Sequence, residues 1–270
     1  MLVCATLFWA GNFMVGKYAF LENIPPMSLV FFRWLLVWLI LLPFTYKEII
    51  KNKDIILNNL PLLFFLAFTS VGLFNTFTYL SLIYTQVINA SLFNTAIPAA
   101  IIFLCFLLKI EKTNKFQIFG LVLSLFGILS IITKLDLNVL LSLNFNKGDL
   151  IMIGGVITWG LYSAFLKKKN FTLPLLTLVQ VLCTLGLIFV FPQFLYELSQ
   201  GLTVKFDMSL GYTLIYLALF PSIGSYYCWA GAVAIIGANR AGIFLSLIPF
   251  FSTIMAIIFF NEQFKFFHLI

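Results

Sequence analysis

The sequence predicts an all-α membrane protein built from long apolar helices. Of its 270 residues, 62% are hydrophobic and only 9% are charged, whereas soluble proteins carry roughly 25% charged residues. The apolar residues occur in runs of about 20, the length that an α-helix needs to cross a bilayer. The sequence lacks the alternation of apolar and polar residues that is typical of outer-membrane barrel strands. We therefore expect lipid, and not water, to surround most of the chain.

Nine apolar segments are long enough to be membrane-spanning helices, and short polar loops separate them. The first segment has no basic stretch before it and no small-residue cleavage site after it. We therefore interpret it as a span and not as a signal peptide. The nine predicted spans are residues 2–20, 27–46, 60–82, 87–108, 116–134, 149–166, 174–196, 211–234 and 241–260.

Residues of the same type recur at one fixed spacing, which indicates an internal repeat. Trp9 and Lys17 each recur 150 residues later, and Asn89–Pro98 resembles Arg240–Pro249, 151 residues further on. A unit of five spans inserts its second copy upside down, as in many transporters. We therefore expect a ten-helix bundle of two inverted repeats (5+5), with the tenth helix largely missing from this chain. The predicted repeats are residues 1–134, with five spans, and residues 148–270, with four spans and the start of a fifth, Phe266–Ile270.

The basic residues of the loops predict the orientation of the chain. Loops on the side of the N-terminus hold ten Lys and Arg residues, whereas loops on the opposite side hold four. Because Lys and Arg favour the cytoplasmic side, we expect a cytoplasmic N-terminus and a place in the bacterial inner (plasma) membrane. The net charge of +7 has this origin. Since no basic face with interleaved aromatic residues lies outside the spans, we expect no nucleic-acid partner.

Four segments follow one another in a characteristic order and spacing: Leu7–Lys17, Pro25–Trp34, Gly148–Tyr162 and Gly237–Pro249. In this order they resemble the EamA family of the drug/metabolite transporter superfamily, and the resemblance covers nearly the whole chain. It implies a ten-helix transporter of metabolites, often amino acids or related compounds, that moves its substrate most often outward.

Polar and aromatic side chains recur on single faces of several spans, at helical spacing. Lipid offers them no hydrogen bonds, so such faces turn toward the protein interior or toward a water-filled cavity. Helix packing is the alternative, and it stays open for the amides and rings. The candidates for a substrate-binding cavity are Trp9, Asn12, Asn75, Tyr79, Asn94, Trp159, Tyr162, Tyr226 and Trp229.

Two prolines and two cations within the spans are further candidates. Pro98 and Pro249 occupy corresponding repeat positions, where each is expected to kink its helix and free a carbonyl for gating. Bending for packing alone is the alternative. Lys17 lies near the end of its span, so we expect its ammonium to extend toward the membrane surface. Arg33 lies deeper and must find a polar partner.

These patterns predict a membrane transporter for a small neutral, zwitterionic or anionic metabolite, working by alternating access through an aromatic-lined cavity. All nine Asp and Glu residues lie in loops or at span ends. The spans therefore offer no buried carboxylate to bind an organic cation or relay a proton. The predicted partners are a small-molecule substrate and the lipid bilayer. The pattern sets no oligomeric state, and a monomer is compatible with it.

A membrane-embedded enzyme and a non-transporting scaffold are the alternatives. An enzyme would need paired aspartates, a Ser/His pair or a metal cluster at membrane depth. His268 is the only histidine, and we expect Asp149 to cap the sixth span. We therefore expect no enzymatic activity, no catalytic residue, no metal and no cofactor.

Overall fold

The computed structural model describes residues 1–111, 114–116, 118–120, 122–123, 126–127, 146–169 and 171–262. Within these residues, every regular element is a helix. Most of the predicted fifth span, 116–134, and all of Phe266–Ile270 lie outside the described residues, as does His268.

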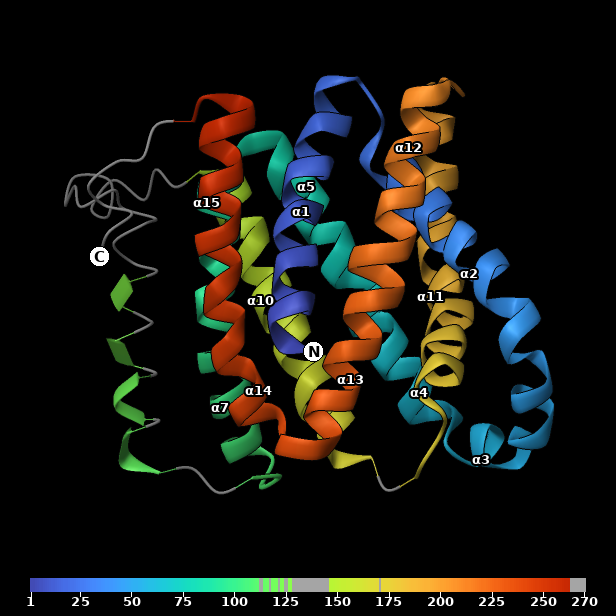
Figure 1. The fold of residues 1–270 in the computed structure, drawn as a ribbon, viewed down its shortest axis with the longest axis vertical. Coiled ribbons are helices and arrows are strands. Elements are labelled where there is room, and N and C mark those ends of the chain that lie inside the picture. The colour runs from blue at the N-terminus through green and yellow to red at the C-terminus, as the bar shows by residue number, and fades with distance from the viewer. Residues whose placement is uncertain are drawn as a thin grey trace.

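Long helices run side by side along the long axis of the molecule, with α1 in the middle of the view in Figure 1. Several spans consist of shorter pieces that follow one another along the chain. The helices are α1 (Leu2–Leu21), α2 (Pro26–Lys51), α3 (Lys53–Asn58), α4 (Leu60–Ala67), η1 (Phe68–Phe74), α5 (Asn75–Tyr84), α6 (Val87–Leu92), η2 (Phe93–Ala96), α7 (Ile97–Leu107), α10 (Lys147–Lys168), α11 (Leu175–Ser199), α12 (Met208–Leu217), η3 (Ala218–Gly224), α13 (Ser225–Ile236), α14 (Ala238–Ile243), η4 (Phe244–Ser246) and α15 (Leu247–Phe260).

Seven helices in the described part of the chain are long and apolar enough to cross a membrane. They correspond to the second, third, fourth and sixth to ninth predicted spans. Helix α1 covers the first predicted span with 20 residues, but it is not among the seven, and polar Asn12 and Lys17 make it less apolar. The seven are Pro26–Lys51, Leu60–Tyr84, Val87–Leu107, Lys147–Lys168, Leu175–Ser199, Met208–Ile236 and Ala238–Phe260.

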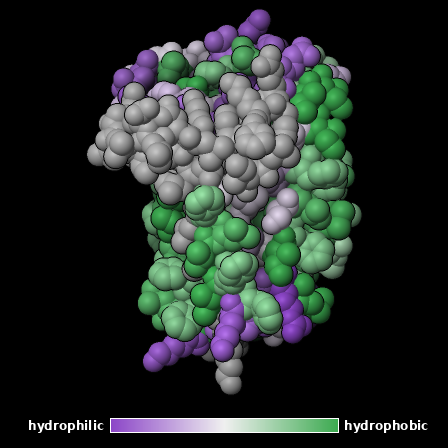
Figure 2. Space-filling model, turned by 90° about the vertical axis from the view of Figure 1, so that its left-hand side faces the viewer, coloured by the Kyte–Doolittle hydropathy of each residue, from purple (hydrophilic) through white to green (hydrophobic). Residues whose placement is uncertain are grey.

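The outer surface fits a lipid environment. On the face shown in Figure 2, hydrophobic side chains occupy the middle of the molecule and hydrophilic ones gather at both ends. Large apolar side chains point outward, among them Phe44 at 75% exposure and Ile235 at 77%. Such surface is stable against hydrocarbon and costly in water.

In four spans, which form two pairs, a short π-helical or 3₁₀ segment interrupts the α-helix. The third and eighth spans contain the π-helical segments η1 and η3, and the fourth and ninth contain the 3₁₀ segments η2 and η4. The members of each pair begin 150 and 151 residues apart, close to the spacing of the sequence repeat. The division into two inverted repeats stays a prediction, to which these paired interruptions add a structural parallel.

Each of the two prolines lies in the first turn of the helix that follows a 3₁₀ segment. Pro98 is the second residue of α7, and Pro249 is the third residue of α15. Proline is tolerated in the first turn of a helix, where its missing N–H is not needed. Each proline therefore stands at the start of a new helical piece instead of in the middle of a smoothly bent helix.

The start of α10 corrects one expectation. The cap is Asn146, whose side chain accepts a hydrogen bond from the Gly148 backbone N–H at 2.7 Å. Asp149 lies in the first turn, and its Oδ1 accepts a hydrogen bond from Thr85 Oγ1 at 2.8 Å. The sequence placed the capping role on the carboxylate, but the preceding amide lies at the position that reaches the free backbone N–H.

Candidate functional site

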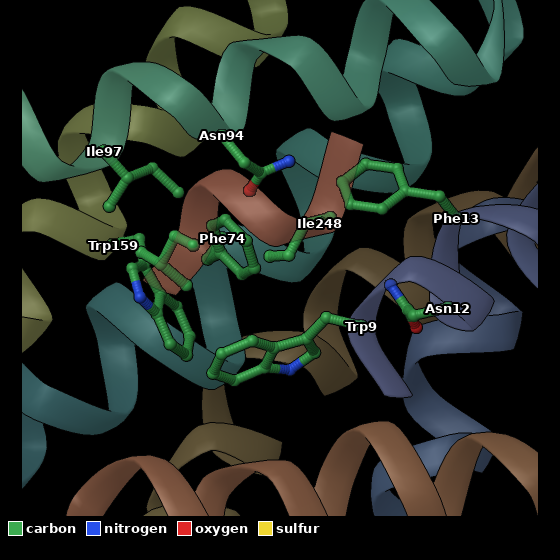
Figure 3. A pocket seen from close by; sticks show the side chains of 9 residues that line it. Trp9, Asn12, Phe13, Phe74, Asn94, Ile97, Trp159 and Ile248 are labelled. Atoms are coloured by element: carbon green, nitrogen blue, oxygen red, sulfur yellow. The ribbon is translucent and has the colours of Figure 1, made fainter. Parts of the chain in front are cut away.

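A small cavity lies where five spans meet. Its volume is about 10 Å³, room for about one water molecule. Figure 3 shows the rings of Trp9 and Trp159 on one side of this cavity, with Asn94 and Ile97 on the other. The described chain is thus closed around this point, and a metabolite can enter only if helices move apart. The cavity is lined by Trp9, Asn12, Phe13, Phe74, Asn94, Ile97, Trp159, Leu245 and Ile248.

Five of the six predicted aromatic residues form one connected ring cluster beside the cavity. Trp159 contacts Trp9 edge-to-face at a centroid distance of 5.1 Å, and it contacts Tyr162 at 4.9 Å. Trp229 lies 5.7 Å from Trp9, and Tyr226 lies 5.5 Å from Trp159. Edge-to-face pairs at these distances are attractive because the positive edge of one ring meets the negative face of another. The structure therefore brings together rings from α1, α10 and α13.

Several polar atoms in this region are buried without a hydrogen-bond partner among the described residues. They include the indole N–H groups of Trp159 and Trp229 and the hydroxyl of Tyr162. In contrast, the indole N–H of Trp9 donates to the Pro221 carbonyl at 3.2 Å. An unpaired buried donor costs free energy, so such groups in a native protein call for an explanation. Of these three residues, only Trp159 lines the cavity.

A buried cationic cluster centres on Arg33, which is 1% exposed. Its Nη1 donates to Asn12 Oδ1 at 2.9 Å and to Asn75 Oδ1 at 3.0 Å. The same Nη1 donates to the Tyr79 hydroxyl at 2.8 Å, and Nε donates to Ser222 Oγ at 2.6 Å. Thus Arg33 finds its polar partners on α1, α5 and η3, as its depth requires.

All these partners are neutral. The one ion pair within 4 Å that the described residues contain is Lys51–Glu48, at 3.8 Å. Arg33 also lies over the ring of Trp34, with Cζ 5.3 Å from the centroid, a contact that stabilises a cation weakly. Asn12 both accepts from Arg33 and lines the cavity. The positive charge is therefore one side chain away from the cavity.

The π-helical segments place two of the partners. A π-helical turn contains one extra residue, which shifts the following side chains and frees backbone carbonyls. Asn75 follows η1 directly, and its Nδ2 donates to the Ser70 carbonyl at 2.9 Å. Ser222 lies in η3, and its Oγ donates to the Leu217 carbonyl at 2.6 Å. Each side chain thus satisfies a carbonyl five residues earlier while presenting an oxygen to Arg33.

Lys17 binds the end of a neighbouring helix. Its Nζ donates to the carbonyls of Leu82 at 3.1 Å and Thr85 at 3.3 Å, and its extension toward the membrane surface stays a prediction. These carbonyls lie at the C-terminal end of α5, the negative end of the helix dipole. Lys17 therefore ties α1 to α5 and is separate from the cavity lining.

The predicted residues thus fall into three groups. Trp9, Asn12, Asn94 and Trp159 line the cavity, Tyr162, Tyr226 and Trp229 belong to the adjoining ring cluster, and Asn75 and Tyr79 bind Arg33. Pro98 lies beside Gly242, near the crossing of the fourth and ninth spans.

The substrate-binding residues that the sequence predicted did not include Ser222, Trp34 or the apolar lining residues. Ser222 stands in a polar stripe of the eighth span, so its face was visible in the sequence. Nothing in the sequence separates Trp34 or the apolar lining residues from ordinary core residues.

Comparison with known proteins agrees with this architecture. The family model of the EamA-like transporter family matches residues 1–133 and 146–270. The chain is 30% identical over 272 residues to an uncharacterized transporter of Archaeoglobus fulgidus, an alignment that covers 99% of this chain and 90% of the relative.

Two proteins of Bacillus subtilis are also similar. The uncharacterized transporter YyaM is 25% identical, with 95% of this chain and 84% of the relative aligned. The uncharacterized transporter YetK is 26% identical, with 100% of this chain and 81% of the relative aligned. With its apolar helices, this chain is an integral membrane protein, and it belongs to the EamA-like transporter family.

Proposed function

We propose that this transporter moves a small metabolite bearing a carboxylate, with neutral amino acids as the leading class. The substrate binds at the central cavity, and the cavity opens alternately to the two sides of the membrane. The physiological direction is outward, from a cytoplasm that also holds the N-terminus. The outward direction rests on the family resemblance, and the orientation rests on the charge of the loops.

The observation that carries this proposal is the neutral environment of Arg33. A buried guanidinium is costly without a counter-charge, and here its partners are amides and hydroxyls. Asn12 separates it from the cavity, so a rotation of this amide would expose Nη1 to a bound solute. A substrate carboxylate would then supply the missing negative charge through a charge-assisted hydrogen bond.

The rest of the cavity suits an amphipathic solute. Indole rings offer apolar faces, and Asn94 and the unpaired indole N–H of Trp159 offer hydrogen bonds. Pockets of this kind, mostly apolar with a few polar groups, fix small ligands by shape and orientation. A permanently cationic solute would find cation–π contacts worth roughly 0.5–2 kcal/mol each, but it would meet the charge of Arg33.

Flux measurements in proteoliposomes test the proposal. Purified protein is reconstituted, and the exchange of a radiolabelled neutral amino acid is compared with that of a quaternary ammonium dye. We expect amino-acid exchange that unlabelled amino acid competes away, with no dye flux above that of empty liposomes. Dye flux without amino-acid flux would show that the substrate class is wrong.

The same preparation separates transport from enzymatic chemistry, the main alternative. Chromatography of the recovered solute should show unchanged amino acid on both sides of the membrane. A membrane-embedded enzyme would yield a chemically altered product, with or without flux. Metabolite profiling of medium from cells that express the protein then identifies which solutes accumulate outside.

A further inference from the structure

Glu111 joins the end of the fourth span to the beginning of the ninth span. It follows α7, and its carboxylate accepts hydrogen bonds from the backbone N–H groups of Ala238 at 3.2 Å and Asn239 at 3.3 Å. These are the first two residues of α14, whose free N–H groups favour a negative charge. Gly237 makes room for the contact, since a Cβ atom there would lie 2.8 Å from Glu111 Oε1.

Glu262 makes the reciprocal contact at the other end. It follows α15, and its carboxylate accepts from the backbone N–H groups of Val87 at 3.0 Å and Ile88 at 3.1 Å. These residues begin α6. Each of the two spans therefore ends in a glutamate that binds the beginning of the other span.

The two spans touch along their length between these ends. Helix α6 contacts α15, α7 contacts α14, and the 3₁₀ segments η2 and η4 contact each other in the middle. Gly242 lies at the crossing, where a Cβ atom would lie 3.3 Å from Ile101 Cδ1 and 3.4 Å from Pro98 Cα. Figure 1 shows α7 and α14 together at one end of the molecule, and the end of α15 at the opposite end.

This geometry allows the two ends to separate independently. Each span is interrupted in its middle by a 3₁₀ segment followed by proline, and such interruptions are where helices bend. The central cavity borders the same segments, since Asn94, Ile97, Leu245 and Ile248 line it. Breaking one glutamate contact would free one half of each span and uncover the cavity from that end.

We propose that Glu111 and Glu262 are the two gate latches of the transporter, one at each end of the crossed fourth and ninth spans. With both contacts formed, the cavity is closed, as in this structure. Release of Glu111 from α14 opens the cavity at that end, and release of Glu262 from α6 opens it at the other. The inference rests on the proposed alternating access, but it concerns helix contacts and requires no particular substrate.

A third glutamate provides a matched control. Glu197, at the end of α11, accepts from the backbone N–H groups of Met27 at 3.1 Å and Ser28 at 2.6 Å, so it caps α2 in the same way. However, α2 and α11 pack together along their length, as the stacked rings of Phe31 and Phe194 illustrate at 4.5 Å. Losing this cap should destabilise the protein without opening the cavity.

The test measures access to the cavity from each side of the membrane. Ile97, a cavity-lining residue that is 1% exposed, is replaced by cysteine in a chain whose native cysteines are replaced by alanine. A membrane-impermeant maleimide is added to one side at a time in vesicles of known orientation. The substitutions Glu111→Gln, Glu262→Gln and Glu197→Gln are compared in this background. The native cysteines are Cys4, Cys105, Cys183 and Cys228.

We expect Glu111→Gln to raise the labelling rate about tenfold from the side where α14 begins, and Glu262→Gln from the opposite side. A tenfold change corresponds to about 1.4 kcal/mol, and hydrogen bonds to charged groups are stronger than neutral ones by about this amount. The Glu197→Gln protein should be labelled at the same rate as the parent protein from both sides. The proposal is overturned if both latch variants are labelled faster from the same side, or if neither is labelled faster than the parent. It is also overturned if Glu197→Gln raises the labelling rate as much as the latch variants do.

A second substitution tests the same end if Glu111→Gln does not fold. Gly237→Ala places a methyl group against the Glu111 carboxylate and also strains the backbone, since Gly237 has a φ of +87°; both effects act at the Glu111 contact and should raise labelling from the same side. No labelling gain in a folded Gly237→Ala protein counts against the latch. Labelling needs no substrate. Absence of amino-acid flux would therefore contradict the proposed function, but the labelling rates would still test the two latches.

Discussion

At the scale of single residues, the guanidinium of Arg33 is a buried positive charge whose hydrogen-bond partners are all neutral. Arg33 lies within an apolar span, and a charged side chain at membrane depth needs polar groups that form hydrogen bonds with it. Its partners come from positions that are 21, 42, 46 and 189 residues away, so only the packing of several helices reveals them. Lys17 likewise binds carbonyls of a distant segment, those of Leu82 and Thr85 at the end of α5, which its place in the sequence does not reveal.

The substitution Arg33→Gln tests the role of the buried charge in substrate selection. Glutamine retains hydrogen-bond donors for Asn12 and Asn75 but removes the positive charge. We expect the preference for an amino acid over its carboxamide, which lacks the carboxylate charge, to fall about tenfold or more, since a charge-assisted hydrogen bond contributes roughly 1.5–3 kcal/mol. Competition by the two solutes against labelled amino acid in proteoliposomes measures this preference.

Two controls separate selection from folding. Arg33→Lys keeps the charge without the planar fork, and it should retain more of the preference than Arg33→Gln does. Lys51→Gln removes an exposed cation that pairs with Glu48 and should leave selection unchanged. If Arg33→Gln weakens both solutes equally, the guanidinium serves the packing of the helices and not recognition of a carboxylate.

At the scale of elements, hydropathy located most of the spans but not their internal breaks. The predicted 60–82 and the observed Leu60–Tyr84 nearly coincide, because a run of apolar residues reports directly on contact with lipid. The π-helical segment η1 within this span went unpredicted. Its sequence, FTSVGLF, is as apolar as an α-helical span, and average polarity does not distinguish the hydrogen-bond register. Pro98 and Pro249 each lie in the first turn of the helix that follows a 3₁₀ segment, and their role in gating stays a prediction.

The prolines offer a test at this scale. Pro98→Ala and Pro249→Ala each restore a backbone N–H and remove a ring that opposes a continuous helix. We expect the thermal unfolding midpoint to stay the same or rise, while the exchange rate in proteoliposomes falls about tenfold because the fourth and ninth spans bend less readily. A tenfold lower rate corresponds to about 1.4 kcal/mol in the barrier.

Pro192 is the matched control for these substitutions. It lies inside α11, a helix that packs along α2 and does not border the central cavity. Pro192→Ala should therefore leave the exchange rate close to that of the parent. Equal loss of rate in all three variants would point to general stiffening of the bundle and against a hinge at the 3₁₀ segments.

At the scale of the whole molecule, the sequence anticipated the helical membrane architecture because composition alone excludes a water-soluble core. The arrangement of the helices was less accessible. Glu111 and Glu262 stand 151 residues apart in the repeat pattern, yet only the folded chain shows that each binds the span of the other half. Such long-range pairing depends on how the spans cross, and hydropathy contains no information on crossing.

The last prediction concerns how the whole molecule sits in the membrane. The ends of α2, α7 and α10 and the start of α14 lie at one end of the bundle in Figure 1, whereas α2 and α12 begin at the other. The basic residues follow this division. Within the described part of the chain, the loops and helix ends at the first end carry Lys47, Lys51, Lys53, Lys109, Lys115, Lys167, Lys168, Lys169 and Arg240, and those at the second carry Lys147 and Lys205, with Lys17 inside the span near the second end.

Short loops rich in Lys and Arg resist translocation, so the first end should face the cytoplasm. Lys51 and Lys205 are both exposed and mark the two ends. In a chain without native cysteines, Lys205→Cys should react with a membrane-impermeant maleimide in intact cells, whereas Lys51→Cys should react only after the membrane is permeabilised. The reverse pattern would place the N-terminus outside. It would also exchange the sides of the two glutamate latches, with Glu262 and not Glu111 guarding the entrance from the cytoplasm.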